Sequence, residues 1–199
     1  MKILGLDSSG IVASVAIVED ENLIAEYTVN YKKTHSQTLL PMLDELVKMT
    51  ELDLDTIDAI AVAAGPGSFT GLRIGSATAK GLGLALKKPL VEIPTVDALA
   101  YNLYDSRALI CPIMDARRSQ VYTGIYRFQE HKLVTVEAQM AVPMAEMIEK
   151  LNARGEEVVF LGDGVPVFGK MIQENLKVPY SFAPAHVNKQ RAAAVAALG

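Results

Sequence analysis

The sequence has little of what several classes of functional site require. Its 199 residues include one cysteine, Cys111, and three histidines without metal-binding spacing, so we predict no disulfide framework, no metal site and no bound cofactor. Positive charge is not in excess, because 19 Lys and Arg stand against 23 Asp and Glu. Domains that bind nucleic acid usually carry a basic excess, so this chain is not expected to hold RNA or DNA alone.

Long apolar runs are also missing. An uninterrupted run such as Ala59 to Ala64 is far too short to span a bilayer. The first three residues lead into a strand-like segment without the pattern of a signal peptide. We therefore expect a cytoplasmic protein that does not enter membranes. Half of the residues are hydrophobic, which is enough to bury a substantial core.

The hydrophobic pattern predicts an α/β protein made of two related halves. In the first half we predict strands over 3–7, 11–18, 23–31, 58–64 and 90–93, and helices over 36–50, 72–87 and 96–104. In the second half we predict strands over 109–114, 120–128, 132–136 and 157–161. Helices are predicted over 143–152, from residue 165 to about 173, and over 192–198.

The two halves share the positions of an acidic turn and a glycine turn. Asp7 ends the first strand of one half, and Asp115 ends the first strand of the other. Gly65-Pro66-Gly67 likewise corresponds to Gly162-Asp163-Gly164. This pattern predicts two lobes, 1–105 and 106–199, of related ββ(β)αβα topology, with both acidic turns near the mouth of a cleft.

Two loops raise the question of phosphate binding. A helix that follows Gly65-Pro66-Gly67 would offer free N–H groups to an anion. The GK[ST] sequence of a P-loop does not follow, and the glycine spacing does not fit GxGxxG. The sequence therefore gives only weak candidates for nucleotide binding: Asp7, Ser8, Gly65, Gly67 and Ser68.

No residue is predicted to be a catalytic nucleophile. Ser68 is not part of a GxSxG elbow, and we expect a loop serine that bonds backbone groups. Cys111 lies in the middle of an apolar strand, where we expect it to be buried and inert. The basic pairs Lys32-Lys33, Lys87-Lys88 and Arg117-Arg118 are scattered and are expected at the solvated surface.

The helix over 72–87 and the one over 36–50 point to an interface. In and just before the 72–87 helix, glycine or alanine recurs at every fourth residue. Each glycine costs about 1 kcal/mol relative to alanine in a helix. Close packing on the chain's own sheet would offset this cost, and so would a second helix from this chain or a partner. The apolar arc of the 36–50 helix is wider than one packing face needs. We predict an oligomer interface formed by Leu39, Leu40, Leu43, Leu46, Val47, Gly71, Leu72, Gly75, Ala79 and Gly83. Gly75→Leu is predicted to break association while the lobe still folds.

The segment over 65–75, GPGSFTGLRIG, resembles a known family. It is similar to the TsaB family, also called YeaZ, of bacterial tRNA threonylcarbamoyladenosine synthesis. Three further segments agree: LDSS over 6–9, HSQ and LPM over 35–42, and DARR with the Val121-Tyr122 pair over 115–122. The resemblance covers essentially the whole chain.

The resemblance implies the duplicated two-lobe fold of the actin, Hsp70 and sugar-kinase superfamily, with mixed sheets flanked by helices. It also implies a non-catalytic scaffold that binds and supports TsaD, the paralogue with the catalytic metal site. The complex adds threonylcarbamoyl to N6 of the adenosine beside the tRNA anticodon. The implied partners are TsaD, the TsaE ATPase, a second copy of this chain, and tRNA through the complex only.

Departures from the superfamily pattern agree with a non-catalytic role. The turns read Asp7-Ser8-Ser9 and Asp115-Ala116-Arg117, where the superfamily usually has Asp-x-Gly, and Ser9 and Arg117 would crowd a phosphate. Residues 93–99 contain no histidine, unlike the metal-binding segment of the paralogue. The family usually continues beyond a helix like 192–198, so we expect a shortened second lobe. An independent ATP-dependent small-molecule kinase or a peptidase-like enzyme of the same fold is the alternative.

Overall fold

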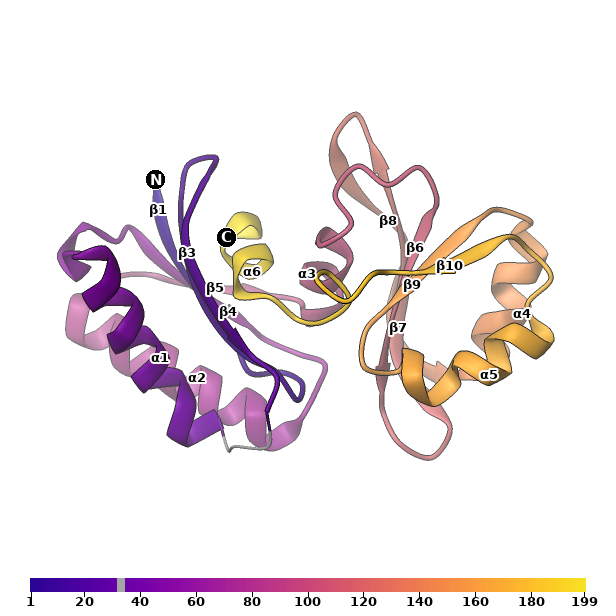
Figure 1. Cartoon of the computed structure of the whole chain (residues 1–199), viewed down its shortest axis with the longest axis horizontal. Helices are drawn as coiled ribbons and strands as arrows, with labels where there is room; N and C mark the ends of the chain where they lie inside the picture. The colour runs from indigo at the N-terminus through magenta and orange to yellow at the C-terminus, as the bar shows by residue number, and fades with distance from the viewer. Residues whose placement is uncertain (32–34) are drawn as a thin grey trace. The chain divides into compact units, whose positions relative to one another are not determined.

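The structure, a computed structural model, describes residues 1–31 and 35–199, so Lys32 and Lys33 lie outside the described residues. The chain forms two compact units (Figure 1). The first comprises Met1–Ala98 together with Gln190–Gly199, and the second comprises Leu99–Lys189. This division differs from the predicted boundary after residue 105 and takes the last ten residues out of the second lobe.

The first unit is built on a five-stranded mixed sheet in the order β3-β2-β1-β4-β5. Its strands are β1 (Lys2–Asp7), β2 (Ala13–Glu19), β3 (Asn22–Val29), β4 (Ala59–Ala63) and β5 (Leu90–Ile93). The first three form the predicted antiparallel meander, while β4 and β5 run parallel to β1. The carboxyl ends of β1 and β4 therefore lie at the same edge of the sheet.

Two helices, α1 (His35–Thr50) and α2 (Phe69–Leu86), cover one face of this sheet (Figure 1). Alternate strand residues such as Leu4 and Leu6 pack against Leu39 and Leu43 in one buried cluster. The second helix begins three residues before the predicted Leu72. A short 3-10 helix, η1 (Leu54–Thr56), precedes β4 and was not predicted.

The other face of the first sheet is covered by α6 (Ala192–Leu198), whereas its place in the sequence predicts that it belongs to the second lobe. Close packing explains this correction. A Cβ atom at Gly5 would lie 2.3 Å from the Ala192 carbonyl oxygen and 2.9 Å from Ala196 Cβ. The alanine-rich helix and the glycine of β1 thus allow the two backbones to approach closely.

The second unit repeats the topology of the first. Its sheet has the order β10-β9-β6-β7-β8, which corresponds strand for strand to β5-β4-β1-β2-β3. The strands are β6 (Leu109–Asp115), β7 (Gln120–Gln129), β8 (Lys132–Pro143), β9 (Val158–Leu161) and the unpredicted β10 (Tyr180–Phe182). The helices α4 (Met144–Arg154) and α5 (Val165–Asn175) pack on its core, and α3 (Thr95–Tyr101) spans the boundary between the units.

In the part of the chain that the structure describes, no helix is long and apolar enough to cross a membrane.

Candidate functional site

The first acidic turn, residues 7–10, lies at the end of β1. Asp7 is 1% exposed, and its Oδ1 accepts hydrogen bonds from the Ser9 N–H (2.8 Å) and the Ser9 hydroxyl (2.6 Å). Its Oδ2 is buried and has no hydrogen-bond partner among the described residues. Burial raises the pKa of Asp7 to about 6, and the bonds from Ser9 only partly oppose this shift. The turn therefore contains a carboxyl that gains or loses a proton in mildly acidic solution.

The glycine loop that follows β4 packs onto this turn. The Ser68 N–H donates to the Ser9 carbonyl (2.7 Å), and the Ser8 hydroxyl donates to the Gly71 carbonyl (2.9 Å). A Cβ at Gly67 would lie 2.3 Å from the Ser9 carbonyl oxygen, and one at Gly71 would lie 2.0 Å from that of Ser8. The glycines thus allow the loop to approach the chain's own acidic turn.

The structure brings the weak nucleotide candidates together, but it also gives them other partners. Asp7 holds its own turn, Ser8 and Ser68 join that turn to α2, and Gly67 fits against Ser9. Gly65 has a φ of 109°, which suits glycine, and its N–H donates to Thr95 Oγ1 at 3.1 Å. Each of the five residues therefore has a structural role in the acidic turn, in the glycine loop or in the contacts that these make with α2 and α3.

Both nucleophile candidates are explained by structure. The Ser68 hydroxyl caps α2 by accepting the Gly71 N–H at 3.3 Å, which confirms the prediction of a loop serine that bonds a backbone group. Burial raises the pKa of Cys111 to about 12, so its thiol stays protonated. Within residues 1–31 and 35–199, no group of three or more His, Cys, Asp or Glu side chains could hold a metal ion.

The second unit has a matching acidic turn. Asp163 Oδ1 accepts the Asp115 N–H at 3.3 Å, and burial raises the pKa of Asp163. Gly162, which precedes Asp163, has a φ of 110°, nearly the same as that of Gly65. The equivalence of the two glycine turns, predicted from the order of strands and turns in the two halves, therefore extends to backbone conformation.

The small residues of α2 form two lines with different surroundings. Gly71, Gly75, Ala79 and Gly83 are buried against the chain's own first unit. A Cβ at Gly75 would lie 2.5 Å from Ser8 Oγ, and one at Gly83 would lie 2.8 Å from Leu90 Cδ2. Packing on the chain's own sheet and loop thus explains this line. The structure gives a leucine side chain at position 75 no room, so we expect Gly75→Leu to disturb the fold of the first unit, contrary to the expectation from the sequence.

Burial also corrects part of the predicted interface on α1. Leu39, Leu43 and Leu46 are buried in the core of the first unit, together with the four α2 residues of the buried line. Leu40 is exposed, and Val47 and Leu72 are partly exposed. Only these last three of the ten predicted interface residues can meet a partner without rearrangement.

The opposite line of α2, Ala77, Gly81 and Ala85, is exposed. Among residues 1–31 and 35–199, no atom outside the helix lies within 4 Å of the position that a Cβ at Gly81 would take. Large apolar side chains accompany this line: Leu84 is 84% exposed and Phe69 is 74% exposed, with the Arg73 guanidinium 5.1 Å from the Phe69 ring centre. We call Phe69, Arg73, Ala77, Gly81, Leu84 and Ala85 the exposed face of α2.

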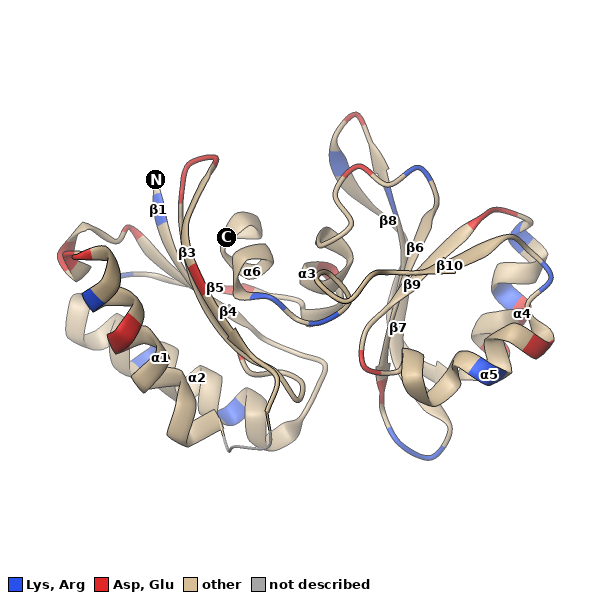
Figure 2. Ribbon diagram, viewed as in Figure 1, with Lys and Arg blue, Asp and Glu red and all other residues tan. Residues whose placement is uncertain are grey.

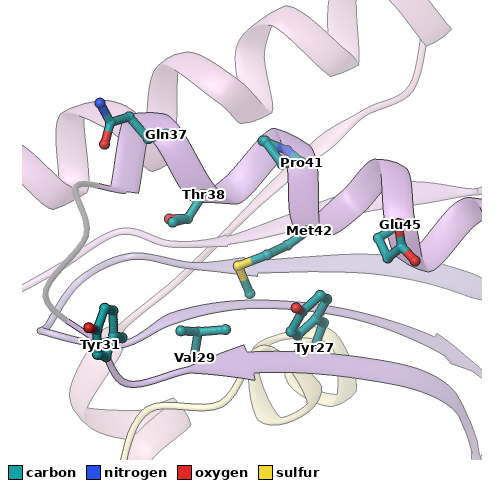
Figure 3. Close-up of a pocket in the computed structure, with 8 residues that line it drawn as sticks. All are labelled: Tyr27, Val29, Tyr31, Gln37, Thr38, Pro41, Met42 and Glu45. Carbon is teal, nitrogen blue, oxygen red and sulfur yellow. The ribbon is translucent and has the colours of Figure 1, made fainter.

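A groove lies beside α1, between this helix and the edge strand β3 (Figure 3). Met42 points from α1 towards Tyr27 and Val29 of β3. Pro41 lies in the second turn of α1, and it cannot donate a hydrogen bond to the Gln37 carbonyl. The groove is lined by Tyr27, Val29, Tyr31, Gln37, Thr38, Pro41, Met42 and Glu45.

The duplicated units define the class of protein. A polyphosphate/ATP-glucomannokinase from Arthrobacter has the same fold at a TM-score of 0.55 and 13% identity, covering 98% of this chain and 95% of that one. The fold is therefore the duplicated two-lobe fold of the actin, Hsp70 and sugar-kinase superfamily.

Closer relatives specify the family. The family model described as TsaD, tRNA N6-adenosine threonylcarbamoyltransferase, matches residues 22–199. The tRNA threonylcarbamoyladenosine biosynthesis protein TsaB of Bacillus subtilis is 34% identical over 100% of this chain and 87% of its own length. YeaZ from Pseudomonas aeruginosa superposes with a TM-score of 0.82 at 26% identity, covering 99% of this chain and 89% of that one. The chain belongs to the TsaB (YeaZ) family.

Proposed function

We propose that this chain is a non-catalytic subunit of the machinery that makes threonylcarbamoyladenosine in tRNA, and that it binds a TsaD-type protein. Relatives that carry the TsaB name are named for this biosynthesis, and the matching family model is that of the transferase itself. Two proteins that share this two-lobe fold can associate with each other, so this chain can pair with the transferase.

The exposed face of α2 is the observation that carries the proposal. A glycine in a helix costs about 1 kcal/mol relative to alanine, and no described part of the first unit packs into the space beside Gly81. Leu84 and Phe69 lie on the same helix with most of their surface in water. A second helix packed along Ala77, Gly81 and Ala85 would use the space and cover these side chains.

The non-catalytic part of the proposal draws support from the acidic turn and the nucleophiles. The Ser68 hydroxyl caps a helix, the Cys111 thiol is buried with a raised pKa, and Asp7 is buried within its turn. These three groups are thus buried or engaged in local contacts of the fold.

The test compares two glycines in similar surroundings. Gly81 of α2 and Gly169 of α5 both have open space where a Cβ would lie. Light scattering after size exclusion would follow Gly81→Leu, Gly169→Leu and the unaltered chain, each alone and mixed with the TsaD-type paralogue from the same cell. We expect Gly81→Leu to weaken the complex tenfold or more, and Gly169→Leu to leave it unchanged.

Each result has a defined meaning. If the unaltered chain does not bind the paralogue, the proposal is refuted. The alternative, an independent kinase or peptidase-like enzyme, would then be examined by nucleotide titration. A complex that tolerates Gly81→Leu would move the interface away from α2, for example to the groove beside α1. Self-association lost in the same variant would indicate that a homodimer and the heterocomplex compete for one surface. Addition of TsaE and tRNA to the heterocomplex would test the two remaining partners.

A further inference from the structure

The turn between β6 and β7 has a backbone conformation that its residues do not favour. Arg117, Arg118 and Ser119 have φ values of 66°, 51° and 59°. The Gln120 N–H donates to the Arg117 carbonyl at 2.9 Å, so Arg118 and Ser119 occupy the two central positions of a tight hairpin turn. Positive φ at both positions defines a type I′ turn, for which Asn-Gly is the preferred pair.

Other bonds hold this turn in place. The Ala116 N–H donates to the Gln120 carbonyl at 3.0 Å, and the Met144 N–H donates to the Ser119 carbonyl at 3.2 Å. Asp115 Oδ1 accepts the Arg117 N–H at 2.9 Å, so this carboxylate oxygen is directed at the backbone of the turn. A conformation that is costly for arginine and serine, yet fixed from several sides, suggests that these side chains serve a purpose other than turn formation.

The two arginines also differ from most others in the chain. Arg127, Arg154 and Arg191 pair with glutamates, and Arg73 lies over the Phe69 ring. Arg117 and Arg118 are exposed, and neither guanidinium forms an ion pair with any residue that the structure describes. In Figure 2 the turn is the blue stretch below the β7 label. It presents two neighbouring unpaired cations on a fixed backbone.

We propose that the turn over residues 116–119 binds the phosphodiester backbone of RNA through Arg117 and Arg118. The guanidinium group has a planar fork of donors that matches phosphate oxygens, and two adjacent groups suit a ligand with repeated phosphates. A fixed turn loses little further freedom on binding. The choice of RNA rests on the proposed function, because relatives named for tRNA modification provide the reason to expect it.

This site reconciles the net charge with a role near tRNA. The whole chain carries a net charge of −4, which argues against RNA binding by a broad basic surface. A local pair of arginines needs no such excess, provided that a partner subunit supplies further contacts. The site would thus position tRNA on the complex without reading its bases.

The experiment measures tRNA binding by the complex of this chain with its TsaD-type partner. Fluorescence anisotropy over a range of potassium chloride concentrations gives the affinity and its salt dependence. For R117A/R118A we expect a loss of affinity on the order of tenfold. The slope of log K against log salt should also fall by about 1.5 to 2, because two phosphate contacts are removed. Arg107→Ala is the matched control, since Arg107 is exposed and forms no ion pair within the described residues.

Two further variants keep the test informative if R117A/R118A does not fold. Ser119→Gly suits the turn and keeps both arginines, so tRNA binding should not change. R118N/S119G creates the favoured turn pair and removes one guanidinium, so about half of the slope change is expected even if R117A/R118A misfolds.

An unchanged slope in both arginine variants would overturn the site. The site would also be overturned if the arginine variants no longer bound the partner protein but kept their affinity for tRNA. The arginines would then bind an acidic segment of a protein. Failure of the proposed function is a separate outcome, in which the unaltered chain does not associate with the paralogue. The arginine site is then tested by comparing the salt dependence of tRNA binding by the unaltered chain and R117A/R118A without the partner.

Discussion

At the scale of single residues, Asp7 links stability to pH. Burial raises its pKa from 3.8 to about 6 in the folded chain, so the folded state binds this proton more tightly than the unfolded state. Stability is therefore lost as pH rises from about 4 to about 6, by roughly 2–3 kcal/mol. Asp7→Asn keeps an acceptor for Ser9 and removes the charge, so it should stabilise the protein above pH 6 and remove this part of the pH dependence.

Urea unfolding of the unaltered chain and Asp7→Asn between pH 4 and 8 would test this sign. The difference between the two curves isolates Asp7 from other groups, including Asp163, whose pKa burial also raises. Parallel curves across the range would contradict the prediction. Asp163→Asn serves as the comparison, because it removes a carboxyl with a raised pKa from the second unit.

Ser119 allows a separate test of the strained turn. Its φ of 59° is costly for serine and easy for glycine. Ser119→Gly should therefore raise the free energy of unfolding by about 1 kcal/mol. Thermal or urea unfolding would measure this, with Gly155 as the reverse control: Gly155→Ala, at a φ of 70° with open space around it, should lower stability by a similar amount. A loss of stability in Ser119→Gly would show that the serine side chain supports the turn.

Neither of these residue-scale features could be read from the sequence. The acidic turn was located by pattern, but the burial of Asp7 depends on a loop more than fifty residues away. The Arg118-Ser119 pair lacks the Asn-Gly signal of a type I′ turn, so its conformation is imposed by neighbouring strands. The sequence also could not divide the glycines of α2 into buried and exposed ones without knowing where the acidic turn lies.

At the scale of the element, the two lines of α2 should respond oppositely to the same substitution. Gly81→Ala adds a methyl group into open space and relieves the glycine penalty, so it should stabilise the protein by about 1 kcal/mol. Gly75→Ala places a Cβ 2.5 Å from Ser8 Oγ, so it should destabilise by about 1–3 kcal/mol. Urea unfolding of both variants would decide. Equal changes in the free energy of unfolding would mean that Gly75 does not face the acidic turn and Gly81 does not face solvent.

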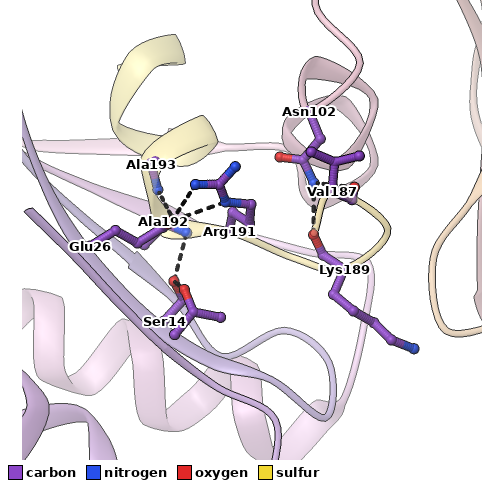
Figure 4. Close-up of polar contacts among 9 residues, drawn as sticks. Ser14, Glu26, Asn102, Val187, Lys189, Arg191, Ala192 and Ala193 are labelled. Atoms are coloured by element: carbon purple, nitrogen blue, oxygen red, sulfur yellow. Dashed lines mark hydrogen bonds and ion pairs between the residues drawn. The ribbon is translucent and has the colours of Figure 1, made fainter. Parts of the chain in front are cut away.

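The attachment of α6 depends on Glu26 of β3 (Figure 4). One carboxylate oxygen accepts the Ala193 N–H at 3.0 Å, and the other accepts the Arg191 Nε–H at 2.9 Å. Glu26→Ala should cost about 2 kcal/mol and increase hydrogen exchange in α6 before other helices. Glu174→Ala, which breaks the exposed pair with Lys170, should change stability by less than about 0.5 kcal/mol. Unchanged exchange in α6 would contradict this role for Glu26.

At the scale of the whole molecule, the duplication could be predicted because strand order and acidic turns recur in both halves. The place of α6 could not. Its sequence, AAAVAAL, has no polar face to show which side is buried, and the surface that receives it is formed by Gly5 and other residues far away in sequence. Proximity in sequence therefore suggested the second lobe, while close backbone packing selected the first.

This arrangement makes the first unit depend on the last residues of the chain. Removal of Gln190–Gly199 would uncover Gly5 and leave the Ser14 hydroxyl without its bond to the Ala192 N–H. We expect the first unit to lose most of its protection from hydrogen exchange. The second unit should keep its protection, because Leu99–Lys189 is continuous and has its own core. Gly5→Val in the full chain should reproduce the effect, since its side chain would collide with the Ala192 carbonyl. If both units lost protection together, the two cores would be one cooperative unit. If neither unit lost protection, the first unit would not need α6, and close packing against α6 would not explain the glycine at position 5.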